Sequence, residues 1–173
     1  MKTNYATIII LFTMFCVAPA RAVTHTAWTA VASTGAVDEA SLGIYTVSGP
    51  AIGYSPGSTS TDSIVTRINV TNGYDYIATH TPPWTTLELG YWDNSEHGSV
   101  SATLWQVVPF TGEQTALCTV TSDDSPTSTR KSCALSSGLD FRNYVFYVAI
   151  KLTRDSTLPL PCAYAVRLYD GTP

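Results

Sequence analysis

The stretch that decides the fold is YVFYVAIKLT, residues 144–153, in which apolar side chains occupy every second position. Successive side chains of a β-strand point to opposite faces of a sheet, so period-two alternation predicts a strand. The opposite face also carries apolar residues, Val145, Tyr147 and Ala149, which favours a central strand with both faces covered. The face that we expect to point into the core contains Tyr144, Phe146, Val148, Ile150 and Leu152.

The same alternation recurs at residues 64–71 and 162–169, and both segments are predicted to be strands. The connections between the predicted strands are rich in Gly, Pro, Ser and Thr, as at 48–63, 71–75, 81–84 and 110–113. A helical turn is predicted only at VDEAS, residues 37–41. Short strands joined by such turns predict an all-β fold, an antiparallel β-sandwich of the jelly-roll or immunoglobulin-like kind.

The N-terminus has the pattern of an export signal. Lys2 precedes an apolar run at residues 8–18 that is too short to span a bilayer, and Ala20-Arg21-Ala22 is a small-x-small cleavage site. We therefore predict a signal peptide at residues 1–22, a single domain at 23–173, and a secreted or periplasmic location. Loss of Lys2 and Arg21 would leave seven of the nine basic residues against thirteen acidic ones. With that charge and no run of basic residues, we expect no nucleic-acid partner and no binding to an anionic membrane surface. We also expect no membrane insertion, since the apolar run is too short to span a bilayer, while the oligomeric state stays open.

Residues 85–92 and 99–108 flank a polar loop at 93–98 and are predicted to form a hairpin. If Trp92 lies opposite Ser99, one register separates the two faces cleanly. Its apolar face pairs Tyr91 with Val100, Leu89 with Ala102 and Leu87 with Leu104.

Aromatic residues of this hairpin region are the candidate ligand-binding residues, namely Trp84, Tyr91, Trp92 and Trp105. Exposed aromatic rings on a β-sandwich can pack against sugar rings. In the predicted register Trp92 and Trp105 share a face but lie roughly 20 Å apart at ~3.3 Å per residue, too far for neighbouring sugar subsites. The alternative is that these tryptophans belong in part to the core. The leading hypothesis is a non-enzymatic binding or surface-interaction module for an extracellular ligand, with carbohydrate first.

The hairpin loop also holds a candidate metal site, formed by Asp93, Asn94 and Glu96. Calcium takes six to eight oxygen ligands, which such side chains can supply. Asp and Asn in turns more often hydrogen-bond the nearby backbone, however. We expect no cofactor, and calcium at this loop is the metal that the sequence allows.

The segment GYSPG, residues 53–57, matches the G-x-S-x-G pattern of serine hydrolases. That pattern needs a backbone N–H after the serine as an oxyanion donor, and Pro56 has none. A hydrolase is therefore the less favoured reading, and we expect no enzymatic activity. The other alternative is a structural subunit of an extracellular assembly, whose sheet would be completed by a strand from a neighbour.

The chain has four cysteines, of which Cys16 lies in the predicted signal peptide. An oxidising compartment favours disulfides among the other three. We predict that Cys118 and Cys133 form a disulfide that closes a polar loop, which leaves Cys162 as a free thiol. Pairing of Cys118 with Cys162 is the alternative.

Several stretches of the chain resemble a group of small secreted bacterial proteins of unknown function. The resemblance implies an exported, single-domain β-sandwich, and it implies no ligand, cofactor or catalytic residue. The stretches that carry it are STGAVDEASLGIY (33–45), TRINVTNGYD (66–75), WTTLELGYWDNS (84–95), LCTVTS (117–122), LDFRNYVFYVAIKLTR (139–154) and YAVRLYDG (164–171).

Overall fold

The structure is a computed structural model that describes residues 27–72, 81–158 and 160–171. The predicted signal peptide, its cleavage site and Cys16 lie outside the described residues. Within the described ranges, no helix is long and apolar enough to cross a membrane.

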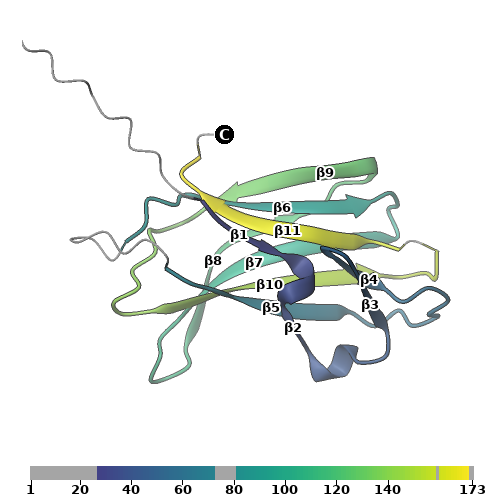
Figure 1. Ribbon diagram of the computed structural model, residues 1–173, viewed down its shortest axis with the longest axis horizontal. Helices are drawn as coiled ribbons and strands as arrows, with labels where there is room; N and C mark the ends of the chain where they lie inside the picture. The colour runs from purple at the N-terminus through teal and green to yellow at the C-terminus, as the bar shows by residue number, and fades with distance from the viewer. Residues whose placement is uncertain (1–26, 73–80, 159, 172–173) are drawn as a thin grey trace, which may run out of the picture.

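The chain folds into two antiparallel β-sheets that stack face to face, and in Figure 1 β9, β6 and β11 of sheet A lie above β10 and β5 of sheet B. Sheet A has the order β3-β4-β11-β6-β9, and β1 pairs with β11 as well. Its strands are β1 (Trp28–Val31), β3 (Tyr45–Ser48), β4 (Ala51–Tyr54), β6 (Thr86–Asp93), β9 (Ser125–Ala134) and β11 (Cys162–Tyr169). The fold is the predicted all-β sandwich.

Sheet B has the order β2-β5-β10-β7-β8. Its strands are β2 (Ala36–Val37), β5 (Ile64–Val70), β7 (Gly98–Val107), β8 (Gln114–Thr121) and β10 (Val145–Arg154). Two short 3-10 turns, η1 (Ala32–Thr34) and η2 (Glu39–Ser41), flank β2. The second of them lies within the predicted helical turn at 37–41, whereas the sequence pattern missed the first.

The core lies between the two sheets and is built from the alternating residues that the sequence singles out. In β10 the residues Phe146, Val148, Ile150 and Leu152 are all buried, as predicted. The strand lies in the middle of sheet B, between β5 and β7. The strand predictions at 64–71 and 162–169 are confirmed by β5 and β11.

The predicted hairpin of residues 85–108 is wrong. Strand β6 pairs with β11 and β9 in sheet A, whereas β7 pairs with β10 and β8 in sheet B. The connection at 94–97 therefore crosses from one sheet to the other. The predicted apolar face is nevertheless correct, because all six of its residues are buried. The two apolar rows point into the core from opposite sheets, and alternation alone cannot distinguish this arrangement from pairing within one sheet.

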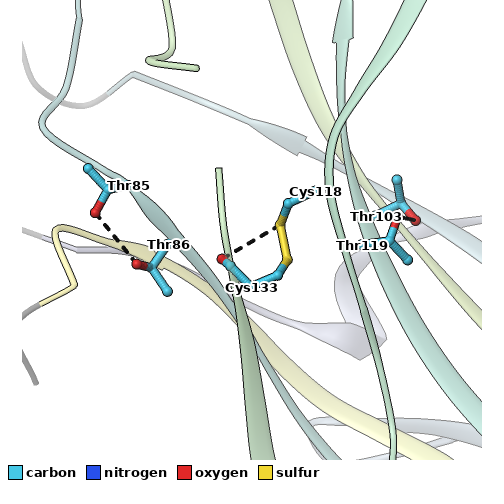
Figure 2. Close-up of a disulfide and its surroundings, with 6 residues drawn as sticks. All are labelled: Thr85, Thr86, Thr103, Cys118, Thr119 and Cys133. Carbon is cyan, nitrogen blue, oxygen red and sulfur yellow. Dashed lines mark hydrogen bonds between the residues drawn. A yellow bond between two sulfur atoms is a disulfide. The ribbon is translucent and has the colours of Figure 1, made fainter. Parts of the chain in front are cut away.

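The predicted disulfide between Cys118 and Cys133 is confirmed, with a Cα–Cα distance of 6.1 Å. Cys118 lies on β8, the edge strand of sheet B, and Cys133 on β9, the edge strand of sheet A (Figure 2). Strand β8 continues to Thr121 and β9 begins at Ser125, so the intervening residues are mostly strand. The bond therefore joins the two sheets at one side of the sandwich, and the prediction of a closed polar loop was wrong in that respect.

Thr66 on β5 is fully buried, and its Oγ1 has no hydrogen-bond partner among the described residues. A buried hydroxyl without a partner costs about 1 to 3 kcal/mol. We expect Thr66→Val to raise the free energy of unfolding by about 1 kcal/mol, because a methyl group replaces that hydroxyl at similar size. Urea denaturation of the purified protein measures the change.

The matched control is Thr103→Val. The Thr103 hydroxyl lies 2.9 Å from that of Thr119, so this substitution removes a hydrogen bond and should not stabilise the protein. A loss of stability in Thr66→Val would contradict the prediction, because it would mean that the Thr66 hydroxyl has found a partner.

Candidate ligand-binding face

Two aromatic side chains lie next to each other on the outer face of sheet B. Tyr147 of β10 is in register with Trp105 of β7, and both point away from the core because their strand neighbours Phe146 and Leu104 point into it. The ring centroids are 6.5 Å apart and the ring planes differ by 18°. Both side chains are half-buried. The strands thus hold two nearly parallel rings at the surface.

Polar side chains surround this aromatic pair. The Tyr147 hydroxyl donates a hydrogen bond to Gln114 Oε1 at 2.6 Å, which fixes the position of the tyrosine. Asn69 of β5 is exposed and lies in register with Tyr147 on the other side. Thr103 and Thr119 follow on the same outer face, with their hydroxyl oxygens 2.9 Å apart. Amide and hydroxyl groups of this kind can both donate and accept hydrogen bonds.

An ion pair lies at one side of the same face. Arg67 Nη1 is 2.9 Å from Asp38 Oδ2, and both side chains are well exposed. The hydrogen bond that Arg67 donates to Asp38 raises the pKa of Arg67 above its ordinary value, and Tyr147 adds to this effect to a smaller extent. The arginine is therefore a permanent cation whose charge is largely balanced by its neighbour.

Two of the predicted ligand-binding residues are placed in the core. Trp84 is 3% exposed and Tyr91 is 2% exposed, so neither ring offers a face to a ligand. Trp84 packs edge-on against Phe141, with ring centroids 6.5 Å apart. The Tyr91 hydroxyl accepts a hydrogen bond from the Asp123 backbone N–H at 3.1 Å. Both residues therefore pack in the core. For Trp84 this is the alternative that the sequence left open.

Trp92 and Trp105 are half-buried on outer faces, but of different sheets. Trp92 belongs to β6 of sheet A and lies in register with Cys162 of β11. The prediction that the two tryptophans share one face is wrong, because it depended on the hairpin. They lie on opposite sides of the sandwich and cannot contact the same short ligand.

The sequence pattern missed Tyr147 as a site residue. The alternation of residues 144–153 shows that Tyr147 points outward, but it does not show which residue of the neighbouring strand lies beside it. Trp105 is 42 positions earlier in the chain, and only the pairing of β10 with β7 brings the two together. A search for outward aromatic residues on all predicted strands would have named both.

The three predicted metal ligands do not converge. Asp93 is 1% exposed, and its Oδ2 accepts a hydrogen bond from Ser122 Oγ at 2.6 Å. Its Oδ1 has no partner among the described residues. Asn94 and Glu96 are exposed instead, and in the described part of the chain no three His, Cys, Asp or Glu side chains form a group that could hold a metal ion. Calcium binding at this loop stays a prediction.

Cys162 is a free thiol, as predicted, and is half-buried on the outer face of sheet A. Burial raises the pKa of this thiol above its ordinary value. A neutral thiol is a poor nucleophile, since the thiolate is the reactive form. Gly53 lies across from it on β4, and a Cβ there would come within 3.1 Å of the Cys162 Cβ. The geometry indicates a packed side chain.

The serine of GYSPG is occupied by a backbone contact. Ser55 Oγ donates a hydrogen bond to the Tyr45 carbonyl oxygen at 2.6 Å. His97 Nδ1 lies 3.0 Å from Asp155 Oδ1. In the part of the chain that the structure describes, no hydrogen bond joins Ser55 to a histidine.

Comparison with protein-family models and with curated proteins gave no match. Among solved structures, the chain is similar to an exo-β-1,3-galactanase from Phanerochaete chrysosporium solved with galactose, with a TM-score of 0.40, 15% identity, and coverage of 83% of this chain and 29% of that one. It is also similar to carbohydrate-binding modules of the β-sandwich superfamily, with a TM-score of 0.39, 14% identity, and coverage of 83% and 54%.

A third similar structure is the C-terminal family 22 carbohydrate-binding module of a Clostridium thermocellum protein. Its TM-score is 0.36 at 15% identity, with coverage of 78% of this chain and 91% of that one. The chain spans less than two thirds of the first two structures. Similarity at this level concerns the β-sandwich fold only.

Proposed function

We propose that this protein is a secreted, non-catalytic module that binds a glycan on the outer face of sheet B. The observation that supports this is the pair of nearly parallel rings of Trp105 and Tyr147, with centroids 6.5 Å apart. One side of a sugar ring presents C–H groups, which pack against an aromatic ring, while the hydroxyls need hydrogen-bond partners. Gln114, Thr103 and Asn69 lie around the rings and can supply them.

The face is prepared for binding before a ligand arrives. Trp105 and Tyr147 lie on adjacent strands in the interior of sheet B, where backbone pairing on both sides holds them in place. The hydrogen bond to Gln114 restricts the Tyr147 side chain further. Side chains that are already ordered lose less entropy when a ligand binds. A disulfide in the fold also fits an oxidising, extracellular location.

The proposal is tested by Trp105→Ala in a binding assay on a panel of immobilised polysaccharides. We expect the affinity for the recognised polysaccharide to fall by about tenfold or more, because loss of an aromatic anchor at a binding site costs about 2 kcal/mol and ~1.4 kcal/mol corresponds to tenfold. The melting temperature should change little, since the side chain lies outside the core.

Trp92→Ala is the matched control, because it removes the same half-buried residue type from the outer face of sheet A. It should leave binding unchanged. If Trp92→Ala abolishes binding and Trp105→Ala does not, the site lies on the other sheet. If the unmodified protein is retained by no polysaccharide, glycan binding is wrong.

A further inference from the structure

The charges of the strands are distributed unevenly between the sheets. The acidic residues within strands are Glu88 and Asp93, and both belong to β6 of sheet A. The described strands of sheet B therefore carry no acidic side chain, although the whole sequence has thirteen acidic and nine basic residues. The strands of sheet B carry three basic residues, which are Arg67 on β5 and Lys151 and Arg154 on β10.

Of these three cations, Lys151 is the one available to a ligand on the outer face. Arg154 is 4% exposed and points into the fold. Arg67 is exposed but paired with Asp38 at 2.9 Å. Lys151 is exposed and makes no ion pair with any residue that the structure describes. An ammonium group without an ion pair thus lies on a sheet whose described strands carry no acidic side chain.

Lys151 lies on the same side of β10 as Tyr147. The two residues are four positions apart, which corresponds to roughly 13 Å at ~3.3 Å per residue. Between them on this side is Ala149, which lies across from Thr103 on β7 and Arg67 on β5, with Thr119 beyond Thr103 on β8. Ala149, Thr103 and Thr119 are small, so a glycan chain that starts on the rings can continue along β10 and β7 toward the lysine. Arg67 and its partner Asp38 border this path on the β5 side.

We infer that the glycan bound by this face is acidic, that is, built with uronic acid units whose carboxylates pair with Lys151. This inference rests on the proposed function. Trp105 and Tyr147 hold a sugar ring, and Lys151 pairs with a carboxylate further along the same chain. An ammonium group is a compact charge that several carboxylate orientations can approach. The separation of roughly 13 Å along the strand requires a ligand longer than one sugar unit.

A nucleic acid fits this face less well. Binding to a phosphate backbone needs a dense set of basic side chains, and the chain as a whole is acidic. Acidic residues also flank the face, with Asp38 and Glu39 next to β2 and Glu113 next to β8. The described strands of sheet B offer only Lys151 as an exposed and unpaired cation, which is too few for binding to a phosphate backbone.

The test compares polygalacturonate with the same polymer after its carboxylates have been reduced to hydroxymethyl groups. We expect the purified protein to bind the acidic polymer more tightly, and added salt to weaken that binding alone. Lys151→Gln should lower the affinity for the acidic polymer by roughly three- to fivefold, the size of an exposed ion pair, and leave the reduced polymer unaffected. Trp105→Ala should weaken binding to both.

Lys131→Gln is the matched control, because Lys131 belongs to sheet A and is paired with Asp123 at 2.6 Å. It changes the net charge equally and should leave binding unchanged. If both polymers bind equally and Lys151→Gln has no effect, the acidic ligand is wrong while glycan binding stands. If neither polymer nor any neutral glycan binds, the proposed function falls as well. Binding to single-stranded poly(dT) alone would also overturn the inference.

Discussion

Replacing Arg154 with alanine should lower the free energy of unfolding by about 3 kcal/mol, because buried carbonyl groups lose their donor. The side chain is 4% exposed at the end of β10. Its Cζ atom lies 4.0 Å from the centre of the Tyr54 ring, a favourable cation–π contact. The guanidinium donates hydrogen bonds to the backbone oxygens of Ser60 at 2.8 Å, Ser58 at 2.6 Å and Thr157 at 3.4 Å. Urea denaturation, monitored by tryptophan fluorescence, measures the loss of unfolding free energy.

Two variants separate this role from a general effect of charge. Arg67→Ala removes an exposed arginine from the same sheet and should cost less than about 1 kcal/mol. Arg154→Lys keeps the charge but loses the planar fork that reaches several carbonyls, so most of the loss should remain. Equal destabilisation by Arg154→Ala and Arg67→Ala would mean that Arg154 does not organise the Ser58 to Ser60 segment.

Cys118→Ala combined with Cys133→Ala should lower the free energy of unfolding by about 3 kcal/mol, or roughly 10 °C in melting temperature. The two cysteines are 15 positions apart, and the bond restricts the unfolded chain accordingly. It also joins the edge strands β8 and β9 of opposite sheets. Differential scanning calorimetry of the oxidised protein and the double variant measures the difference.

The control for this prediction is dithiothreitol. The reductant should lower the melting temperature of the unmodified protein and of Cys162→Ala, because both retain the disulfide. It should not affect the double variant. An unmodified protein whose melting temperature is the same with and without reductant would contradict a stabilising disulfide.

The alternation of residues 144–153 was enough to predict the central strand and the residues that it buries. The strand at 64–71 could be predicted for the same reason, since one of its faces is buried and the other is not. The strand at 162–169 was also predicted, but a β-bulge between Ala163 and Ala165 changes which positions point inward, from Ala163 to Val166 and Leu168. Sheet membership could not be predicted. The same alternation is expected in two arrangements. The apolar row of Leu87, Leu89 and Tyr91 can pair with the row that begins at Val100 within one sheet, or it can pack against that row from the opposite sheet.

The candidate site was predictable in part. Trp105 is where an outward aromatic residue was expected, but its neighbour Tyr147 depends on the pairing of distant strands. The structure places Trp84 and Tyr91 in the core. Their burial was hard to predict because a large aromatic ring fits the core as well as the surface, and the sequence around it does not decide between them. The disulfide was predictable because an inward cysteine on a strand and a second one nearby leave few alternatives.

The bond between Cys118 and Cys133 also restricts how two copies of this protein could exchange strands. Domain swapping requires an edge strand to leave its own sheet and enter that of a neighbour. Strand β9 lies at the edge of sheet A but is tied covalently to β8 in sheet B. Under oxidising conditions β9 cannot leave without β8, so an intertwined dimer that exchanges β9 alone requires reduction first.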